Sequence, residues 1–295
     1  MSERGKIRIW NKCNNNCIFC SVDSKSNSDN ENMTTEQIKK KIRDIKEEGC
    51  KEILIFGGEP TIRKDFFEIF DFIQKMDFER VNLQSNGRMF SYPDFINKAK
   101  KYNINYIISI HGHNKGLHNM LTNSTSFEQT SNGIKNLVKD GQKVSSNTVI
   151  NKHNQEHIYD IAKMLIKEGV TTLQFALMHP FGLGKKNFGD LAIDINSIKD
   201  EITRVVDYCN EKNVLVFFEG FPLCMLGKNK DKATEKTLIK HIRSYSKEHE
   251  IESYRDWLRE HKAKSKECER CMINDICEGY FKEYGEIELI KVEPE

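Results

Sequence analysis

The sequence lacks any long apolar run, and no stretch approaches the ~18 residues that a membrane-spanning helix requires. Its polar beginning, MSERGKIRIW, lacks the apolar segment of a signal peptide. It also lacks an excess of charge of one sign, because 46 Lys and Arg oppose 44 Asp and Glu for a net charge of +2. A near-neutral chain has no overall attraction for nucleic acid. We therefore expect a cytoplasmic protein whose partners include neither a membrane nor a nucleic acid.

Cysteine is plentiful by contrast, with nine residues in the 295-residue chain. In a reducing compartment, clustered cysteines are metal ligands or catalytic groups more often than disulfides. Cys50 and Cys209 each stand at the edge of a helical pattern and fit the role of small buried hydrophobes. Six of the remaining seven form two tight groups near opposite ends of the chain, and these groups indicate two metal sites.

Short β-like runs alternate with longer helical runs over residues 6–177. This alternation predicts six strands, at 6–10, 52–56, 79–84, 104–110, 143–150 and 170–177. The intervening helices are expected at 34–49, 65–76, 91–102, 126–140 and 154–168, and a further helix and strand at 194–212 and 214–220. Such a series favours parallel βαβ units in an α/β fold. Periodicity alone fits either an open doubly wound sheet or a partial barrel.

The pattern changes after Phe221. Residues 228–266 read as a charged helical stretch, and the compact cysteine-rich segment CERCMINDICEGYFKEYG follows it. We therefore place a boundary near residue 220. Residues 1–220 are expected to form the larger α/β domain, and residues 221–295 a small Cys-rich lobe.

The first cysteine group, Cys13, Cys17 and Cys20, follows the first predicted strand with the spacing C-x3-C-x2-C. In a parallel α/β protein this loop lies at the carboxyl ends of the strands, where ligands bind. Three thiolates this close in sequence must converge on one centre, and no nearby residue completes the four-ligand set of structural zinc. An iron–sulfur cluster held by three thiolates would keep one iron open for a ligand.

The segment CNNNCIFC (13–20), with Phe19 before its third cysteine, resembles the signature of radical S-adenosylmethionine (radical SAM) enzymes. GGEP (57–60), directly after the second predicted strand, resembles a second motif of that family. The resemblance implies a partial (β/α)6 TIM-like barrel, with a [4Fe–4S] cluster on the three cysteines that binds SAM. One electron from the cluster would cleave SAM to methionine and a 5′-deoxyadenosyl radical, which abstracts hydrogen from a substrate.

The resemblance also implies which residues contact SAM. These are Phe19, Gly57, Gly58, Glu59 and Pro60, then Ser85, Asn86 and Ser109, with Asn147 or Thr148 a weaker candidate. An ordinary turn is an equal explanation for Gly57-Gly58 and a serious rival for Ser85-Asn86-Gly87. Four histidines follow strand ends, namely His111, His113, His118 and His179, and can be acids, bases, substrate contacts or ordinary loop residues. No catalytic residue is assigned.

The second cysteine group has the spacing C-x2-C-x5-C at Cys268, Cys271 and Cys277, and Cys224 is the nearest fourth thiolate. Four thiolates can hold either a zinc staple or a [4Fe–4S] cluster. The spacing resembles part of the SPASM domain and its shortened twitch form, which implies one auxiliary [4Fe–4S] cluster. The closing C-x3-C of the full SPASM pattern is absent. Cys224 is expected to be a ligand, with a hydrogen-atom donor as the alternative.

Two functions of different classes follow. The favoured one is a radical SAM oxidoreductase or maturase that acts on a peptide or a small molecule, with an electron donor such as ferredoxin or flavodoxin. The alternative is a non-catalytic iron–sulfur electron carrier or a zinc-stapled binding module. The alternative accounts for the cysteines, but it leaves both GGEP and the long βα series unexplained.

Overall fold

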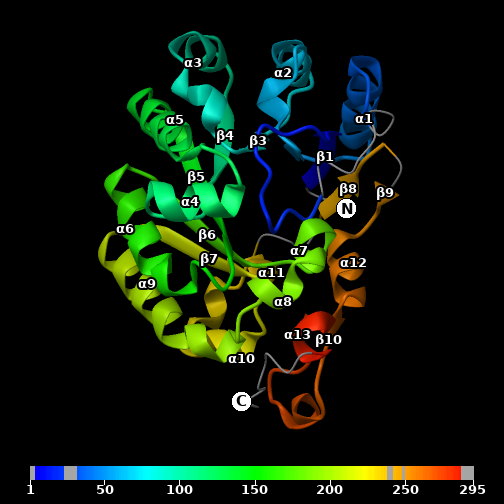
Figure 1. Cartoon of the computed structure of the whole chain (residues 1–295). Coiled ribbons are helices and arrows are strands. Elements are labelled where there is room, and N and C mark those ends of the chain that lie inside the picture. Colours follow the sequence, from blue (N-terminus) through cyan, green and yellow to red (C-terminus); the bar gives the residue numbers. More distant parts are fainter. Residues whose placement is uncertain (1–3, 23–31, 238–241, 248–249, 287–295) are drawn as a thin grey trace.

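The computed structural model describes residues 4–22, 32–237, 242–247 and 250–286, and its centre is one nine-stranded sheet. The strand order is β7-β6-β5-β4-β3-β2-β1-β8-β9, so the first seven strands follow the order of the sequence (Figure 1). Those seven are parallel: β1 (Arg4–Trp10), β2 (Glu52–Gly57), β3 (Arg80–Ser85), β4 (Ile104–Ser109), β5 (Lys143–Ile150), β6 (Thr172–Leu177) and β7 (Leu215–Glu219). The sheet curves without closing, and the predicted α/β partial barrel is confirmed.

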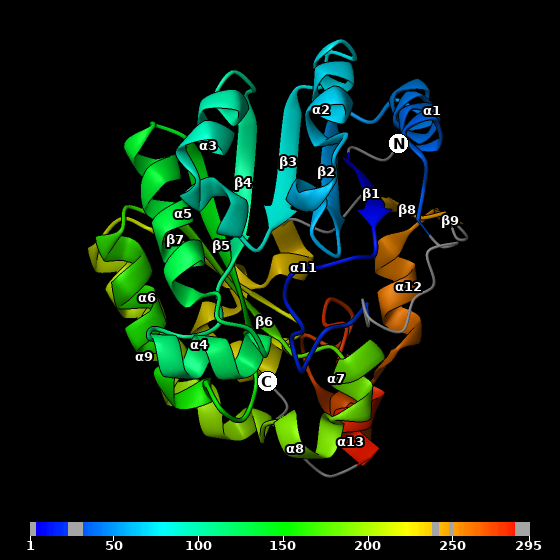
Figure 2. The same ribbon diagram turned by 45° about the horizontal axis from the view of Figure 1, so that its top comes forward.

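Helices cover the outer face of this sheet (Figure 2). The larger ones are α1 (Thr35–Glu47), α2 (Phe66–Gln74), α3 (Pro93–Ala99), α5 (Phe127–Lys139), α6 (Ile158–Lys167) and α9 (Lys199–Glu211). A further helix, α4 (Lys115–Thr122), lies at the carboxyl ends of the strands. Helix α1 shows why such helices form and pack on the sheet. Thr34 and Gln37 make a reciprocal capping box at its N-terminus, and three isoleucines at helical spacing are buried. Each such buried side chain contributes about 1.5–3 kcal/mol.

Smaller elements connect the barrel to the end of the chain. They are α7 (Gly182–Lys186), α8 (Phe188–Leu191), α10 (Leu223–Leu226), α11 (Thr234–Thr237), β8 (Ile242–Tyr245), β9 (Glu250–Ile251), α12 (Tyr254–Glu260), β10 (Lys262–Ala263), β11 (Tyr280–Phe281) and α13 (Lys282–Glu286). None of the helices in the described ranges has the length and apolar composition needed to cross a bilayer.

The charged stretch 228–266 was expected to be helical, and this expectation is wrong. Its described part contains short helices and the strands β8, β9 and β10. The reason is tertiary: Ile242 and Tyr245 are buried where β8 pairs in parallel with β1, and this pairing overrides the helix propensity of Lys and Glu. The C-terminal part of the chain therefore extends the barrel sheet beyond β1.

A buried ion cluster joins the end of the barrel to the cysteine-rich segment. Lys262, only 2% exposed, lies 3.1 Å from Glu235 and 3.3 Å from Glu278. Glu235 also accepts a hydrogen bond from the backbone N–H of Gly220, just after β7. Near the proposed boundary at residue 220, the end of the barrel and the cysteine-rich segment are thus joined by buried ion pairs and a hydrogen bond.

Candidate active site

A cavity of about 320 Å³ lies inside the barrel, and the sequence-predicted residues converge on it. Its lining includes the first cysteine group and seven of the expected SAM contacts: Cys13, Cys17, Cys20, Phe19, Gly57, Gly58, Ser85, Asn86, Ser109 and Asn147. They come together because the strands are parallel, so loops and side chains at successive carboxyl ends meet at one mouth. The volume lies at the lower end of the range for small-molecule sites.

Backbone hydrogen bonds hold the cysteine loop on more than one side. The N–H of Asn16 donates to the carbonyl of Thr122 in α4 at 2.9 Å, and Ile18 donates to Leu121 at 3.1 Å. On the other side, Leu183 of α7 donates to the carbonyl of Cys20 at 2.8 Å. In Figure 2 the loop after β1 runs between these two helices. The spacing of the thiols is therefore set by neighbouring elements and not by the loop alone.

Gly57 and Gly58 bring β2 into backbone contact with the start of this loop. Gly58 donates its N–H to the carbonyl of Trp10 at 2.6 Å. A Cβ on Gly57 would lie 2.3 Å from the Trp10 carbonyl oxygen, and one on Gly58 would lie 2.3 Å from that of Lys12. Gly57 also has a φ of +152°, a conformation that L side chains rarely adopt. Only glycine permits this approach.

Glu59 and Pro60 do not line the cavity. Glu59 is fully buried behind it, and its carboxylate accepts hydrogen bonds from Thr61, from the Ser85 hydroxyl at 2.8 Å and from the Asn86 N–H at 2.6 Å. Burial raises the pKa of Glu59, and these donors oppose that shift. Pro60 is buried at the start of the short turn Pro60–Ile62. Both residues are placed to position the cavity wall.

Polar groups around Cys13 suit a thiolate ligand. The Asn15 N–H donates to Cys13 Sγ at 3.4 Å, and the Asn86 amide nitrogen lies 3.9 Å from the same sulfur. Burial raises the pKa of Cys13 to about 12, with Glu59 adding to the shift. Burial also raises the pKa of Cys17, helped by Cys20 and Cys13. Two neighbouring thiols that resist ionisation suit a site where positively charged iron compensates the charge of their thiolates.

His111 lines the cavity as a neutral group. Burial lowers its pKa well below the ordinary value, with a smaller contribution from His118. Its Nδ1 accepts the backbone N–H of Val149 at 3.2 Å, so the proton of the neutral ring is on Nε2. The ring packs edge-on against Phe19, with centroids 4.6 Å apart. His118 is buried behind it and accepts the N–H of His111, which makes His118 a positioning residue.

The opposite wall of the cavity carries charged residues that the sequence did not single out. Lys6 of β1 places its ammonium 4.6 Å from the Phe56 ring centroid and 4.0 Å from that of Tyr254. Burial lowers the pKa of Lys6 to about 8. Glu219 of β7 accepts a hydrogen bond from the Gln174 amide, and its carboxylate lies 3.4 Å from His179 Nε2.

Glu219 is ionised despite its burial. Burial alone would favour the neutral acid, but His179, Lys6 and Lys262 together lower the pKa of Glu219. A signal for this wall exists in the sequence, because Arg4, Lys6 and Arg8 alternate with buried Ile7 and Ile9 along β1. Charged side chains on the inward face of a barrel strand indicate a binding surface.

Arg88 is a further residue that the sequence analysis missed. Its guanidinium donates to the carbonyl of Asn14, to Asn15 Oδ1 at 2.9 Å and to Ser124 at 3.1 Å. The side chain thus fixes the segment between Cys13 and Cys17 from outside the cavity. It follows Ser85-Asn86-Gly87, and its position just after a strand end was the only hint of this role.

The second cysteine group also converges. Cys224, Cys268, Cys271 and Cys277 all line one small hollow beneath α10. Two backbone N–H groups, of Leu223 and Gly279, donate to Cys277 Sγ at 3.4 Å. Donors of this kind are typical around metal-bound thiolates. The structure thus brings together the four thiols that the sequence grouped.

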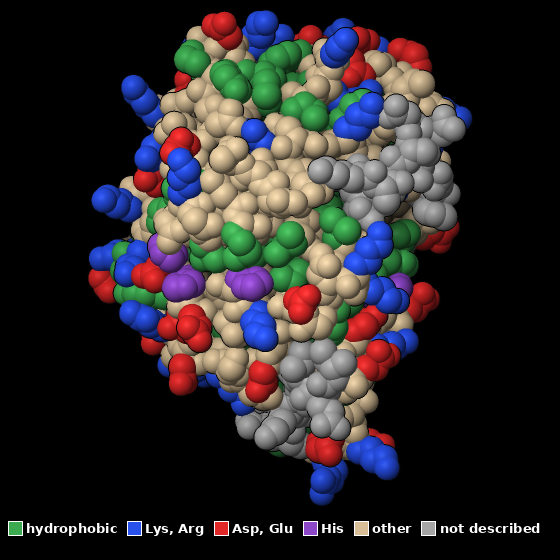
Figure 3. Space-filling model, in the orientation of Figure 1, with side chains coloured by type: hydrophobic (Ala, Val, Ile, Leu, Met, Phe, Trp, Pro, Cys, Tyr) green, Lys and Arg blue, Asp and Glu red, His purple; other side chains and the backbone are tan. Residues whose placement is uncertain are grey.

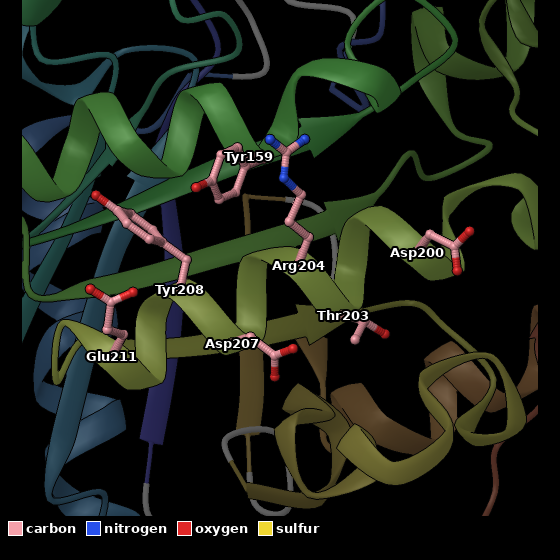
Figure 4. Close-up of a pocket in the computed structure, with 7 residues that line it drawn as sticks. All are labelled: Tyr159, Asp200, Thr203, Arg204, Asp207, Tyr208 and Glu211. Carbon is pink, nitrogen blue, oxygen red and sulfur yellow. The ribbon is translucent and has the colours of Figure 1, made fainter.

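A different hollow, of about 470 Å³, lies on the outer surface between α6 and α9 (Figure 4). There the Arg204 guanidinium stacks over Tyr159 at 3.7 Å from the ring centroid, and Tyr208 meets the same ring edge-on. The remaining lining is Asp200, Thr203, Asp207 and Glu211. This hollow contains no cysteine and lies on the helical layer, so the barrel cavity is the better candidate active site.

Comparison with known proteins gives a family match. Residues 7–165 match the model of the radical SAM superfamily. A probable GTP 3′,8-cyclase of Saccharolobus solfataricus is 28% identical over 202 residues, which are 68% of this chain and 64% of that relative. A probable GTP 3′,8-cyclase of Sulfurisphaera tokodaii is 28% identical over 62% of this chain and 58% of its own length. The chain thus aligns with less than two thirds of these curated relatives.

Solved structures agree on the fold. The crystal structure of Streptococcus suis SuiB bound to S-adenosylmethionine superposes with a TM-score of 0.72 and 15% identity, over 95% of this chain and 73% of SuiB. Native anSMEcpe with bound AdoMet superposes with a TM-score of 0.54 and 19% identity, over 72% of this chain and 63% of anSMEcpe. At these identities the likeness concerns the fold alone.

Proposed function

The chain belongs to the radical SAM superfamily, and on this basis we propose that it reductively cleaves SAM and uses the resulting radical on a peptide or small-molecule substrate. The observation that carries the proposal is the convergence of Cys13, Cys17, Cys20 and the Gly57-Gly58 backbone on one cavity. A [4Fe–4S] cluster on the three thiols, when bound, would supply the electron that splits SAM into methionine and a 5′-deoxyadenosyl radical.

The residues of this chain would bind and orient the reactants. The Gly57-Gly58 backbone offers close approach to the amino-acid end of SAM, and Ser109 and Asn147 offer hydrogen bonds from the neighbouring strands. Ser85 and Asn86 are kept in place by Glu59, which makes Glu59 a positioning residue. His111 presents a neutral ring as hydrogen-bond donor, and its pKa leaves it uncharged at neutral pH.

The charged wall is where we place the substrate. Lys6 can bind an anionic group, and Glu219 with His179 can accept a proton or hold a cationic or hydroxyl group. Lys6 comes from the first strand and Glu219 from the seventh, so a substrate held by both would contact the two ends of the parallel series of strands. A substrate that carries charge or several hydroxyl groups is favoured over an apolar one.

Peptide modification is the preferred reaction, and GTP is a second candidate substrate. The second cysteine group favours a peptide-modifying maturase, since its spacing resembles an auxiliary-cluster domain of such enzymes. GTP is supported by the names of the curated relatives. The electron donor would be a ferredoxin or a flavodoxin. The non-catalytic alternative has less support, because it does not explain why GGEP and a polar barrel cavity meet the cysteine loop.

For the second group we propose one auxiliary [4Fe–4S] cluster on Cys268, Cys271, Cys277 and Cys224. Support comes from their shared hollow and from the two N–H donors on Cys277. A zinc staple on the same four thiolates is the alternative, and metal analysis separates the two.

The test is cleavage of SAM by the anaerobically reconstituted chain with dithionite, followed by chromatography and mass spectrometry. We expect 5′-deoxyadenosine and methionine in equal amounts, even without substrate. Added GTP or candidate peptides should then be consumed only when SAM is present. If the protein with verified iron content releases no 5′-deoxyadenosine, it is not a radical SAM enzyme of this kind.

A further inference from the structure

A second set of metal-ligating side chains lies on the outside of the barrel. The ligand atoms of His113, His157 and Asp160 all lie within 4.8 Å of one another. His113 belongs to the loop between β4 and α4, whereas His157 and Asp160 stand one helical turn apart at the start of α6. Figure 3 shows histidine side chains gathered on the surface in this region, around α4 and α6.

The two histidines of this cluster already lie close together. The rings of His113 and His157 lie 5.0 Å apart between centroids, and both residues are half-buried. His113 Nε2 contacts the Asn114 side-chain amide at 2.8 Å, while its Nδ1 is buried and makes no hydrogen bond to any residue in the described ranges. A buried polar atom without a partner costs free energy that a bound ion would recover.

The carboxylate of Asp160 has two charged or polar neighbours. His157 Nδ1 lies 3.8 Å from Asp160, and Lys163 pairs with the other Asp160 oxygen at 2.8 Å. Lys163 is the nearest competing cation, so a metal ion must share Asp160 with it or displace it. This competition would make the site moderate in affinity and sensitive to the charge at position 163.

We propose that His113, His157 and Asp160 form a binding site for a divalent transition-metal ion of the zinc class. Two imidazoles and one carboxylate are a ligand set that zinc accepts, with water in the fourth position. Tetrahedral zinc separates such ligand atoms by about 3.4 Å, so side-chain adjustments of about 1 Å suffice. The softer thiols of the two cysteine groups are not involved.

The site would brace the rim of the active-site cavity. His113 lies two residues after His111, whose ring lines the cavity, and α6 packs on the outside of the sheet. A metal ion would tie the β4–α4 loop to the start of α6. Zinc should therefore make the loop more resistant to proteolysis and raise the melting temperature. The inference does not depend on what the cavity does.

The experiment uses chain whose cysteine sites are filled with iron–sulfur cluster, so that thiols do not take up the added metal. Zinc binding is measured by calorimetry and by metal analysis after dialysis. We expect about one zinc ion per chain, and an affinity at least about tenfold lower in His113→Ala, His157→Ala and Asp160→Asn. His153→Ala removes a nearby exposed histidine and is the matched control.

Lys163→Ala separates metal binding from a mere structural effect. Removal of the competing ammonium should strengthen zinc binding, whereas a variant that only disturbed α6 would weaken it. Unchanged zinc affinity in all three ligand variants, or an equal loss in His153→Ala, would overturn the proposal. Far-ultraviolet circular dichroism of each variant shows that it is folded, so that a loss of binding can be interpreted.

Discussion

The hydroxyl of Ser85 at the end of β3 donates a hydrogen bond, 2.8 Å long, to the buried carboxylate of Glu59 at the end of β2. The same carboxylate accepts the N–H of Asn86, whose side-chain nitrogen lies 3.9 Å from Cys13 Sγ. One acidic side chain thus connects GGEP, the next strand end and the first cysteine. A change at Glu59 should therefore affect the whole part of the cavity that the cysteine loop lines.

Glu59→Gln should therefore impair both stability and SAM binding. The amide keeps one acceptor oxygen but turns an NH₂ toward groups that are themselves donors, which costs about 1–3 kcal/mol. We expect a lower melting temperature and weaker SAM binding, measured by differential scanning fluorimetry and calorimetry on cluster-loaded protein. Thr61→Val removes only the Thr61 hydroxyl donor and keeps the backbone N–H, so it should have the smaller effect on both stability and SAM binding. Equal SAM affinity in wild type and Glu59→Gln would contradict the positioning role.

Lys6→Met should stabilise the protein at neutral pH while weakening substrate turnover. Burial lowers the pKa of Lys6 to about 8 from the ordinary 10.5, so between these values the unfolded chain binds more protons and stability rises with pH. Below pH 8 the charged ammonium destabilises the fold, and its removal should gain about 1–3 kcal/mol. The gain should vanish towards pH 10.5, as melting temperatures across this range would reveal.

The exposed Lys98 provides the matched control for that experiment. Lys98→Met should change the melting temperature little and equally at every pH. A destabilising effect of Lys6→Met below pH 8 would contradict this prediction. It would mean that the Lys6 ammonium stabilises the fold by pairing with Glu219 and that this pairing outweighs the cost of its burial.

Cys17→Ala should abolish SAM cleavage, because two thiolates hold a four-iron cluster poorly. The measured quantities are 5′-deoxyadenosine release and iron content after reconstitution. Cys209→Ala is the control, since Cys209 is buried in α9 and lines neither cysteine site. It should cost about 1 kcal/mol of stability and leave iron content unchanged. Cleavage retained in Cys17→Ala would remove this loop from the cluster site.

Cys268→Ala should lower iron content by about four atoms per chain and spare SAM cleavage in the absence of substrate, if the second site holds a [4Fe–4S] cluster. Metal analysis decides the question directly. A loss of one zinc with constant iron would establish the staple instead. Cys224→Ala tests its own role, since loss of the second metal identifies a ligand and intact metal with lost product formation identifies a hydrogen donor.

Lys262→Met should be strongly destabilising. The ammonium is 2% exposed and faces Glu235 and Glu278, so its removal leaves the buried carboxylate of Glu235 uncompensated, while Glu278 keeps its pair with Arg255, at a cost of about 3–5 kcal/mol. Burial would lower the pKa of Lys262, but the two carboxylates raise it above the ordinary value. The added substitution Glu235→Gln should recover part of the melting temperature, whereas Lys282→Met, at an exposed position, should change it little.

The side of the cavity that holds the cysteine loop could be predicted from the sequence, whereas Tyr254 in the opposite wall could not. Gly57 and Ser85 are the last residues of β2 and β3, and Cys13 lies three residues after β1, so the parallel order of the strands is enough to bring them together. Tyr254 reaches the cavity only because β8 pairs with β1 across more than 230 residues of chain. Such long-range pairing leaves no local pattern, and the Lys- and Glu-rich composition around β8 suggested a helix instead.

Glu59 illustrates a second limit. The motif correctly drew attention to it, but sequence spacing cannot tell whether a carboxylate enters a cavity or is buried behind it. The donors that decide this, Thr61, Ser85 and Asn86, come from two different strand ends. Their combined geometry exists only after the sheet has formed.

The pairing of β8 with β1 has a consequence for attempts to recombine this protein with its relatives. Strand β1 pairs with β8 along one edge, and its last residue, Trp10, is followed three residues later by Cys13. A chimaera that imported a foreign C-terminal half would alter the lateral support of that strand and, with it, the anchorage of the whole cysteine loop. Successful grafts should therefore keep residues 242–247 with the barrel and change partners only beyond them.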